Sequence, residues 1–236
     1  MKIRIDLKIF VFVLIFIFTH QIKLYAILML FALIHELGHL LAGVLLKFKP
    51  NKLEIMPYGL SVGFNIKCED YNRKIKKANM LAVKRLIIAA AGPLTNLIII
   101  VMNLLFNIDF LGIQREIIIY SNILIGLFNL IPIYPLDGGR ILKEIIHIIC
   151  GLEKSYRYTN LVSRVTVCLF TFICSIAIIY IRNIGVVIIL SYLWYLAIIE
   201  NKKYNRWHQM YKQINIKNAI NWFAFFYYLL IEKYFI

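Results

Sequence analysis

Long uncharged runs of apolar residues dominate this chain and limit what it can fold into. A helix that crosses a bilayer needs about 20 apolar residues, because the hydrocarbon core is about 30 Å thick and a helix rises about 1.5 Å per residue. Apolar residues make up 61% of the sequence, against about half in an ordinary soluble domain. The runs lie at 9–19, 24–34, 86–108, 117–136, 165–181 and 183–199. The sequence therefore predicts a polytopic membrane protein.

The expected fold class is all-α, with about six transmembrane helices. These helices are predicted at about 9–22, 25–47, 86–106, 116–136, 161–181 and 184–200. Together they form a predicted membrane core over residues 1–200, followed by a cytosolic or interfacial tail over 201–236. In the tail, the apolar stretch 222–231 is too short to span a bilayer and predicts a helix lying in the interface.

The segment 51–66 is irregular, because Pro57, Gly59 and Gly63 stand among its apolar and aromatic residues. One interpretation is a hairpin that dips back into the membrane, which is tolerated where protein covers the backbone. The other is an ordinary loop between a membrane helix and the charged residues that follow. The sequence does not decide between the two.

Basic residues are distributed between the apolar runs rather than gathered in one patch. If the N-terminus is cytosolic, only Lys23, Arg115 and Arg182 of the 27 lysines and arginines fall on the opposite side of the membrane. Loops rich in lysine and arginine stay in the cytosol, so both termini are predicted to be cytosolic. The net charge of +15 is thus explained by membrane orientation, and we expect no nucleic-acid binding.

The second apolar run contains the sequence HELGH, in which His35 and His39 are four residues apart and Glu36 follows the first histidine. Residues four apart share one helix face, so the two imidazoles can bind one metal ion. Glu36 is then placed to act on a water molecule, as in HExxH zinc proteases. The alternative is a pair of packing histidines with Glu36 as their partner, but such groups are costly in an apolar helix unless something satisfies them.

Catalytic zinc takes three protein ligands and keeps the fourth position open. Asp137 is the leading candidate for the third, because it ends a long uncharged run within the sequence IPIYPLDGG, residues 131–139. Prolines and glycines there break the helix, and bare backbone at membrane depth is permitted at a site or a cavity. The predicted topology also places Asp137 at the depth of the two histidines. Asp137 could instead cap the next helix, and Glu144 and His147 remain candidate ligands.

These motifs together resemble the site-2 protease family (M50) of intramembrane metalloproteases, and within it the bacterial sporulation branch. HELGH at 35–39 matches the HExxH motif of the family, and AGPLTN at 91–96 matches its GPxxN element. Asn129, Pro132 and the LDG at 136–138 match its Asn-containing LDG motif. The resemblance covers roughly residues 1–200.

The resemblance implies a role for each matched residue. His35, His39 and Asp137 would bind zinc, and Glu36 would activate water. Asn129 would contact the substrate, although a buried asparagine can equally hydrogen-bond a neighbouring helix. The segment 51–66 would correspond to the membrane-embedded hairpin of the family, near the substrate.

The resemblance also implies partners and a location. The substrate would be a membrane-associated precursor such as a sporulation pro-sigma factor, cleaved in the bacterial cell or forespore membrane, and inhibitory membrane proteins would be further partners. Many members of the sporulation branch carry a C-terminal CBS domain. Only 36 residues follow Glu200, so we expect no CBS domain within this tail.

Two rival functions remain open at this stage. A membrane zinc protease with a cytosolic HExxH domain usually needs a downstream helical glutamate, and Glu54 lies in the irregular segment instead. A transporter or channel could use buried histidine and acidic groups as an ion path, and this reading predicts no zinc and no proteolysis.

Overall fold

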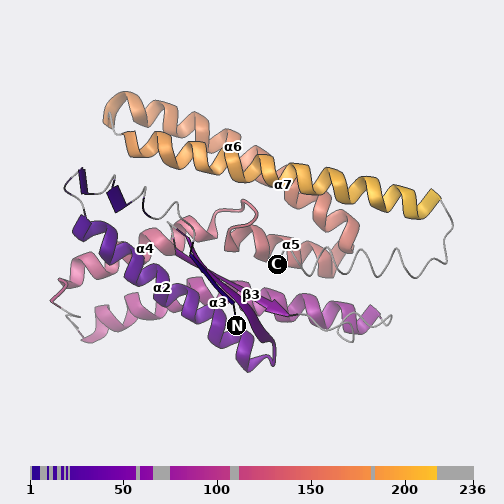
Figure 1. Cartoon of the computed structure of the whole chain (residues 1–236), viewed down its shortest axis with the longest axis horizontal. Coiled ribbons are helices and arrows are strands. Elements are labelled where there is room, and N and C mark those ends of the chain that lie inside the picture. Colours follow the sequence, from indigo (N-terminus) through magenta and orange to yellow (C-terminus); the bar gives the residue numbers. More distant parts are fainter. Residues whose placement is uncertain are drawn as a thin grey trace. The chain divides into compact units, whose positions relative to one another are not determined.

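The computed structural model of the chain describes residues 2–5, 10, 13–14, 17–18, 20, 22–56, 59–65, 75–106, 112–181 and 184–216 (Figure 1). The elements run in the order β1 (Lys2–Ile5), α2 (Ile22–Leu45), β2 (Lys49–Met56), β3 (Gly59–Asn65), α3 (Ile75–Phe106), α4 (Arg115–Leu130), α5 (Asp137–Cys150), α6 (Leu152–Ile181) and α7 (Ile184–Ile216). Helices dominate, which confirms the predicted fold class, and three short strands are an addition that the sequence pattern did not predict.

The chain divides into two compact units. The first contains β1, α2, β2, β3, α4 and the part of α3 from residue 87 onward. The second contains the start of α3 up to residue 86, the segment that precedes α5, and helices α5, α6 and α7. The predicted boundary at residue 200 lies within α7, which runs to Ile216, and the division into a membrane core and a tail stays a prediction.

In the first unit, α2 packs against α4 and against the strands β2 and β3. Phe31 and Ala32 of α2 form a buried cluster with Ile118 and Ile125 of α4. Ile27, Leu28 and Ile34 of α2 pack against this cluster, so the apolar residues of α2 recur at the three- to four-residue spacing of one helix face. This packing fixes the face of α2 on which the HELGH residues lie.

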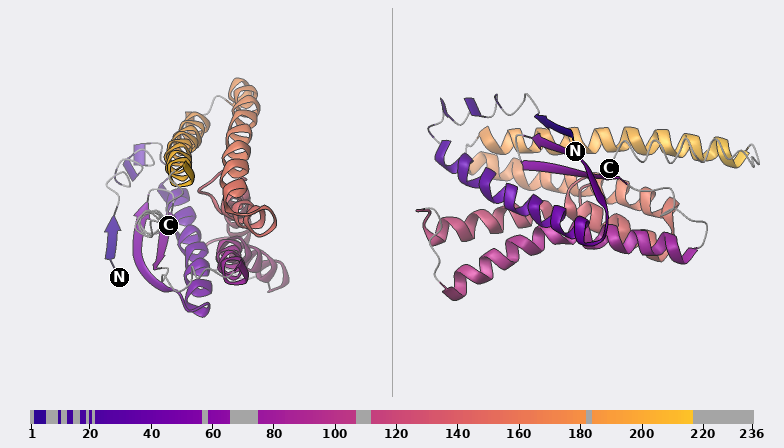
Figure 2. Two further views of the ribbon diagram at one scale, coloured as in Figure 1. Left: turned by 90° about the vertical axis from the view of Figure 1, so that its right-hand side faces the viewer. Right: turned by 60° about the horizontal axis from the view of Figure 1, so that its bottom comes forward.

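The three strands form one sheet in the order β1–β2–β3. β1 pairs parallel with β2, and β2 pairs antiparallel with β3 from Lys49↔Asn65 to Met56↔Gly59. The predicted hairpin at 51–66 is therefore a β-hairpin whose tip, residues 57–58, lies outside the described residues. The views in Figure 2 show β2 and β3 alongside α2. A Cβ at Gly43 of α2 would overlap the ring of Phe64, so β3 sits directly on the helix. Membrane insertion of the hairpin stays a prediction.

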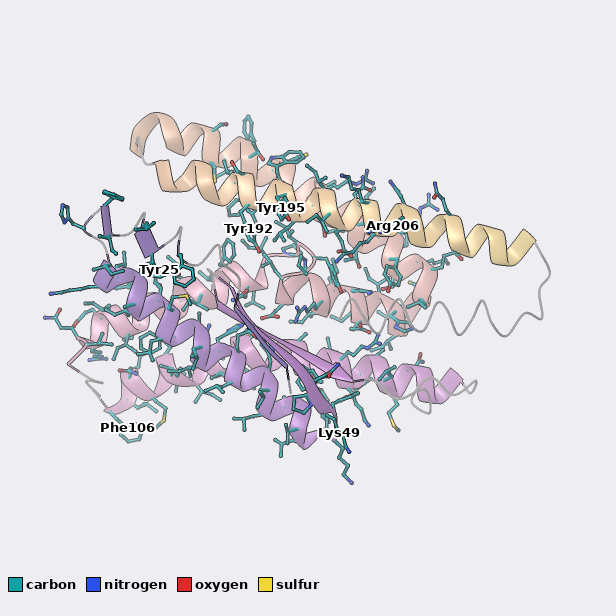
Figure 3. The ribbon with its side chains drawn as sticks, viewed as in Figure 1. Tyr25, Lys49, Phe106, Tyr192, Tyr195 and Arg206 are labelled. Carbon is teal, nitrogen blue, oxygen red and sulfur yellow. The ribbon has the colours of Figure 1, made fainter. Side chains whose placement is uncertain are left out.

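Among the described residues, three helices are long and apolar enough to cross a membrane: Ile22–Leu45, Asn79–Phe106 and Leu152–Ser175. They correspond to the predicted second, third and fifth segments. Their outer faces carry exposed apolar side chains, including Leu41 on α2 and Phe106, which projects from the end of α3 (Figure 3). Much of the predicted first segment, and the predicted interfacial helix at 222–231, lie outside the described residues. The count of six spans stays a prediction.

The helix within the predicted fourth segment, 116–136, ends before the apolar run does. α4 ends at Leu130, residues 131–136 are not helical, and α5 begins at Asp137. Pro132 and Pro135 lack the N–H that a continuing helix needs and clash with the preceding turn, so the helix cannot extend through the apolar sequence. The break places Asp137 in the first turn of a new helix.

In the second unit, α5 packs against α6 and α6 against α7, and α6 and α7 run side by side in both Figure 1 and Figure 2. Asn160 of α6 donates a hydrogen bond to Asn201 of α7, with 3.1 Å between Nδ2 and Oδ1. Trp194 Nε1 of α7 donates to Thr171 Oγ1 of α6 at 2.9 Å. Polar pairs of this kind join helices whose other faces are apolar.

The contact between α2 and α3 predicts the effect of Gly38→Ala. A Cβ at Gly38 would overlap Thr95 Oγ1 and lie 3.0 Å from the backbone oxygen of Ala91, so the helices would have to separate. We expect a loss of about 1–3 kcal/mol of stability, measured as a lower thermal unfolding midpoint in detergent. Gly126→Ala in α4 is the control, because a Cβ there meets only ordinary contacts at 3.5 Å or more. An unchanged midpoint for Gly38→Ala would contradict this packing.

Candidate metal centre

His35 and His39 lie one turn apart on the buried face of α2, with exposed fractions of 1% and 3%. Their Nε2 atoms are 3.2 Å apart, and the ring planes are inclined at 82°. The Nδ1 atom of His39 lies 2.6 Å from the backbone oxygen of Ile88 on α3. Because a carbonyl only accepts hydrogen bonds, Nδ1 carries the proton and Nε2 is left with its lone pair. This outer contact is typical of metal-binding histidines, whose second nitrogen donates to a carbonyl or carboxylate.

Gly92 of α3 leaves the space that the two imidazoles occupy. A Cβ at this position would overlap His39 Nε2 and lie 2.6 Å from His35 Nε2. Any larger residue would therefore push into the point where the two Nε2 atoms converge. The sequence resemblance included this glycine in a motif, but its spatial role becomes visible only when α3 is placed beside α2.

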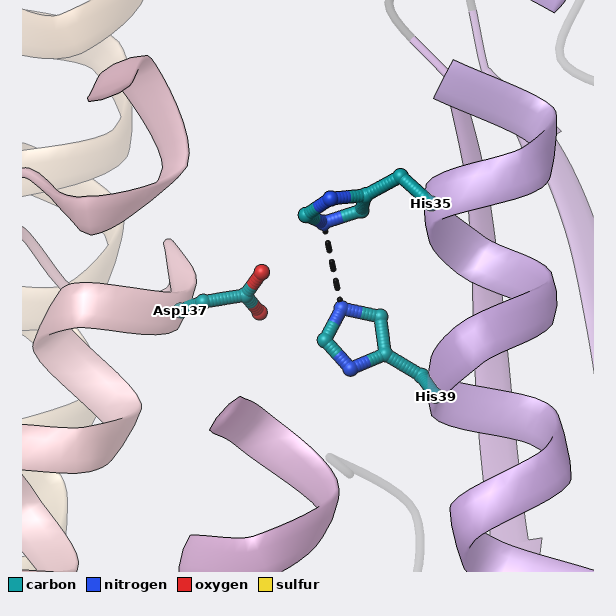
Figure 4. Close-up of side chains that lie close together, drawn as sticks. All are labelled: His35, His39 and Asp137. Carbon is teal, nitrogen blue, oxygen red and sulfur yellow. Dashed lines mark hydrogen bonds between the residues drawn. The ribbon is translucent and has the colours of Figure 1, made fainter. Parts of the chain in front are cut away.

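Asp137 is buried, with an exposed fraction of 5%, and begins α5. One ligand atom each from His35, His39 and Asp137 lies within 4.8 Å of the others (Figure 4). The capping alternative is not seen: Leu136 occupies the N-cap position, and no side chain caps the helix. Two imidazole nitrogens and one carboxylate oxygen are the donor set of a catalytic zinc site, so the residues present fit a metal ion. Their assignment as ligands stays a prediction.

Glu36 and Asn129 are both half-buried, the first on α2 and the second in the last turn of α4. Glu36 is adjacent in the chain to one histidine of the cluster, and the group of three ligand atoms does not include it. The roles of Glu36 as base and of Asn129 as substrate contact stay predictions.

Glu144 and His147, the other candidate ligands, engage each other on α5. His147 Nδ1 lies 3.5 Å from Glu144 Oε2, and Arg85 Nη1 lies 3.8 Å from Glu144 Oε1. Both acidic oxygens thus face basic nitrogens within the second unit, as a buried carboxylate requires. These contacts account for Glu144 and His147 without a metal ion.

Buried asparagines are a feature that the sequence indicated only in part. Asn96, which the GPxxN match had singled out, is fully buried on α3, and Asn122 is fully buried on α4. Asn122 Nδ2 donates to its own helix, to Ile118 O at 2.8 Å. Nothing in the pattern around Asn122 distinguished it from an exposed polar residue, because its burial depends on which helix face meets α3.

The sequence matches a known protein family and known proteins. Residues 108–173 match the model of peptidase family M50. A zinc metalloprotease of Methanocaldococcus jannaschii is 32% identical over 140 residues, which cover 57% of this chain and 36% of the relative. Stage IV sporulation protein FB of Bacillus subtilis is 28% identical over 153 residues, which cover 64% of this chain and 49% of the relative. The chain thus spans about half or less of the length of these relatives.

A solved structure shows a similar fold. The site-2 protease from Methanocaldococcus jannaschii superposes with a TM-score of 0.61 over 84% of this chain and 89% of that chain, at 24% sequence identity. The matched share of 84% is larger than the segment 108–173 that the family model matches.

Proposed function

We propose that the chain is a zinc-dependent intramembrane endopeptidase of peptidase family M50, whose model matches residues 108–173. The observation that carries the proposal is the buried group of His35, His39 and Asp137, whose ligand atoms lie within 4.8 Å of one another. The three helices that are long and apolar enough to cross a bilayer support a site within the membrane.

The donor set favours zinc among the common metal ions. Two neutral imidazoles and one carboxylate leave a fourth position open, which is typical of catalytic zinc and unlike the all-oxygen sites of magnesium or calcium. A zinc ion held there supplies the Lewis acid that activates water and polarises the scissile carbonyl. The hydrogen bond from His39 Nδ1 to Ile88 O holds one ring in the tautomer that such binding needs.

Glu36 would carry the proton transfers. In the proposed reaction its carboxylate takes a proton from the attacking water and later gives it to the leaving amine. A glutamate on the same helix as the histidines keeps a constant distance from them, since helix geometry fixes their spacing. A helical substrate would have to unwind locally, because its own hydrogen bonds otherwise shield the scissile carbonyl.

We further propose that the bond cleaved lies near the cytosolic face of the membrane, in a membrane-associated precursor. The similarity to a sporulation protein supports a substrate such as a sporulation pro-sigma factor, with cleavage in the bacterial cell or forespore membrane. The distribution of lysine and arginine supports cytosolic termini. Asn129 would contact the unwound substrate, and inhibitory membrane proteins would be regulatory partners.

Metal removal tests the proposed function directly. We expect the purified protein to contain about one zinc ion per chain and to cleave a membrane-inserted helical precursor in liposomes. Stripping the metal with a chelator should abolish cleavage, and added zinc should restore it. Asp137→Ala should lose most of its zinc, whereas Glu153→Ala, which removes an exposed carboxylate on α6, should keep it. Wild-type protein without metal and without cleavage would instead favour the ion-path function.

A further inference from the structure

We propose that Lys143 and Ser163 are positioning residues, which fix the Asp137 carboxylate by bracing the segment 131–136 against α5 and α6. The inference rests on the proposed function, because it takes Asp137 as a metal ligand. All of the contacts that carry it lie within the second unit.

The segment 131–136 needs support because it has little regular structure of its own. Its internal hydrogen bonds are two short turns, from Ile133 N to Ile131 O at 2.7 Å and from Leu136 N to Ile133 O at 2.8 Å. Asp137 follows directly, as the first residue of α5, and no side chain caps that helix end. The position of the carboxylate therefore depends on where this segment lies, as well as on Arg140 of α5, whose Nη1 atom is 3.9 Å from Asp137 Oδ1.

Ser163 holds the middle of the segment from α6. The backbone N–H of Tyr134 donates to Ser163 Oγ, with 3.0 Å between the two atoms. Ser163 is almost completely buried, so its hydroxyl is shielded from bulk solvent. A buried N–H that lost this acceptor would be left unsatisfied, and the segment would move to find another partner.

Lys143 holds the same residue through its side chain. The Nζ atom of Lys143 on α5 lies 3.8 Å from the ring centroid of Tyr156 on α6 and 5.1 Å from that of Tyr134. A cation between two aromatic rings attracts both, more strongly when the group is removed from water. Lys143 is 8% exposed, and burying an ammonium group is costly for stability alone. The ammonium group thus links Tyr134 to Tyr156 on the neighbouring helix. An apolar side chain could fill the same space without the cost of burying a charge, so packing alone does not explain a lysine here.

The segment has no room to shift independently of α5. A Cβ at Gly139, in the first turn of α5, would lie 2.5 Å from Ile133 C and 2.6 Å from Tyr134 Cα. The backbone of the segment is therefore in direct contact with the turn that presents Asp137. Metal sites tolerate displacements of only about 0.2 Å in ligand distances, so a small movement of the segment should weaken metal binding without abolishing it.

The test measures zinc affinity of the purified full-length protein by competition with a chromophoric chelator. Lys143→Met keeps most of the side-chain volume and removes the cation, and Ser163→Ala removes the hydroxyl. Each should raise the zinc Kd about tenfold, the lower end of the effect of losing an outer partner of a metal ligand. Lys143→Arg should keep a zinc affinity close to that of the wild type, because the guanidinium group is also a cation and stacks on aromatic rings.

Matched controls separate positioning from general stability. Lys154→Met removes an exposed lysine of α6, and Ser175→Ala removes an exposed serine whose hydroxyl donates to its own helix, to Phe172 O. Both should leave the zinc Kd within about twofold of wild type, well below the outer-partner effect. The thermal midpoint of the metal-free protein should be no lower for Lys143→Met than for Lys143→Arg, because methionine removes the cost of the buried charge. A weaker zinc affinity in Lys143→Met would then reflect ligand placement and not lost stability.

The outcomes distinguish this inference from the function on which it rests. A wild-type protein that binds no zinc would overturn the proposed function, and the inference with it. A wild type that binds zinc, together with unchanged affinity in Lys143→Met and Ser163→Ala, would overturn the inference alone. If Ser163→Ala fails to fold, the inference is tested by comparing the zinc affinity of Lys143→Met with that of Lys143→Arg. Equal affinities in these two variants would refute the positioning role of Lys143.

Discussion

Glu36→Gln is expected to lower the rate of peptide cleavage about 10³-fold, within the range for a lost general base, while the zinc content stays at the wild-type level. Glutamine has nearly the size of glutamate but cannot take a proton from water. The zinc content should be preserved because the three proposed ligand atoms come from His35, His39 and Asp137. Cleavage of a helical precursor in liposomes and metal analysis of the same preparation measure the two effects together.

The matched control for this prediction is Glu153→Gln, which makes the same chemical change at an exposed site on α6 and should leave both cleavage and zinc unchanged. Loss of zinc in Glu36→Gln would mean that Glu36 binds the metal itself. Cleavage at the wild-type rate would show that Glu36 is not the general base. Another residue would then have to act as the base, or the cleavage would not be catalysed by this protein.

The histidine pair was predictable because its geometry is local. In a helix, a spacing of four residues fixes the relation of two side chains whatever the rest of the fold does, and the apolar run made the helix certain. Asp137 is about 100 positions away, and no local rule brings it near the histidines. Its prediction depended on a helix break at two prolines, on a common depth in the membrane and on the resemblance of the LDG motif to that of the site-2 protease family. The ligand atoms of the three residues lie within 4.8 Å of one another, and the role of Asp137 as a ligand stays a prediction.

Other features depend on contacts that hydropathy does not encode. The strands were missed because β1 pairs with β2 across about 50 residues, and strand pairing is decided by the partner as much as by the segment itself. The helix α7 continues past residue 200, the predicted end of the last membrane span, to Ile216, because glutamate and lysine residues are good helix formers. A charge can end a membrane span without ending a helix.

Lys143 and Ser163 show a further limit of sequence patterns. In the sequence nothing distinguishes either residue from the other polar residues around it. Both are buried because α5 and α6 pack together around the segment that precedes Asp137. Residues that act through a backbone segment become recognisable only when that segment has been placed against its neighbours.

Gly92→Ala should weaken zinc binding by about 10- to 100-fold. The added methyl group would overlap His39 Nε2 and lie 2.6 Å from His35 Nε2, so at least one imidazole must rotate or α3 must move away. Overpacking of this kind costs about 1–3 kcal/mol, and about 1.4 kcal/mol corresponds to a tenfold change in affinity. If the added methyl group displaces the imidazoles, the variant loses metal affinity. The stability of the metal-free protein should change little, because alanine is a better helix former than glycine and offsets part of the strain.

Zinc competition and thermal unfolding of the metal-free protein, measured on Gly92→Ala and on Gly126→Ala, separate these two effects. Gly126 lies on α4, where a Cβ would be 3.5 Å from Asn96 Nδ2 and meets no closer atom, so its alanine variant should bind zinc as the wild type does. A Gly92→Ala protein that is folded and deficient in zinc would place the metal where the two Nε2 atoms converge. Wild-type affinity in that variant would instead mean that the imidazoles bind metal in another orientation, and Gly92 would then serve only the close approach of α3 to α2.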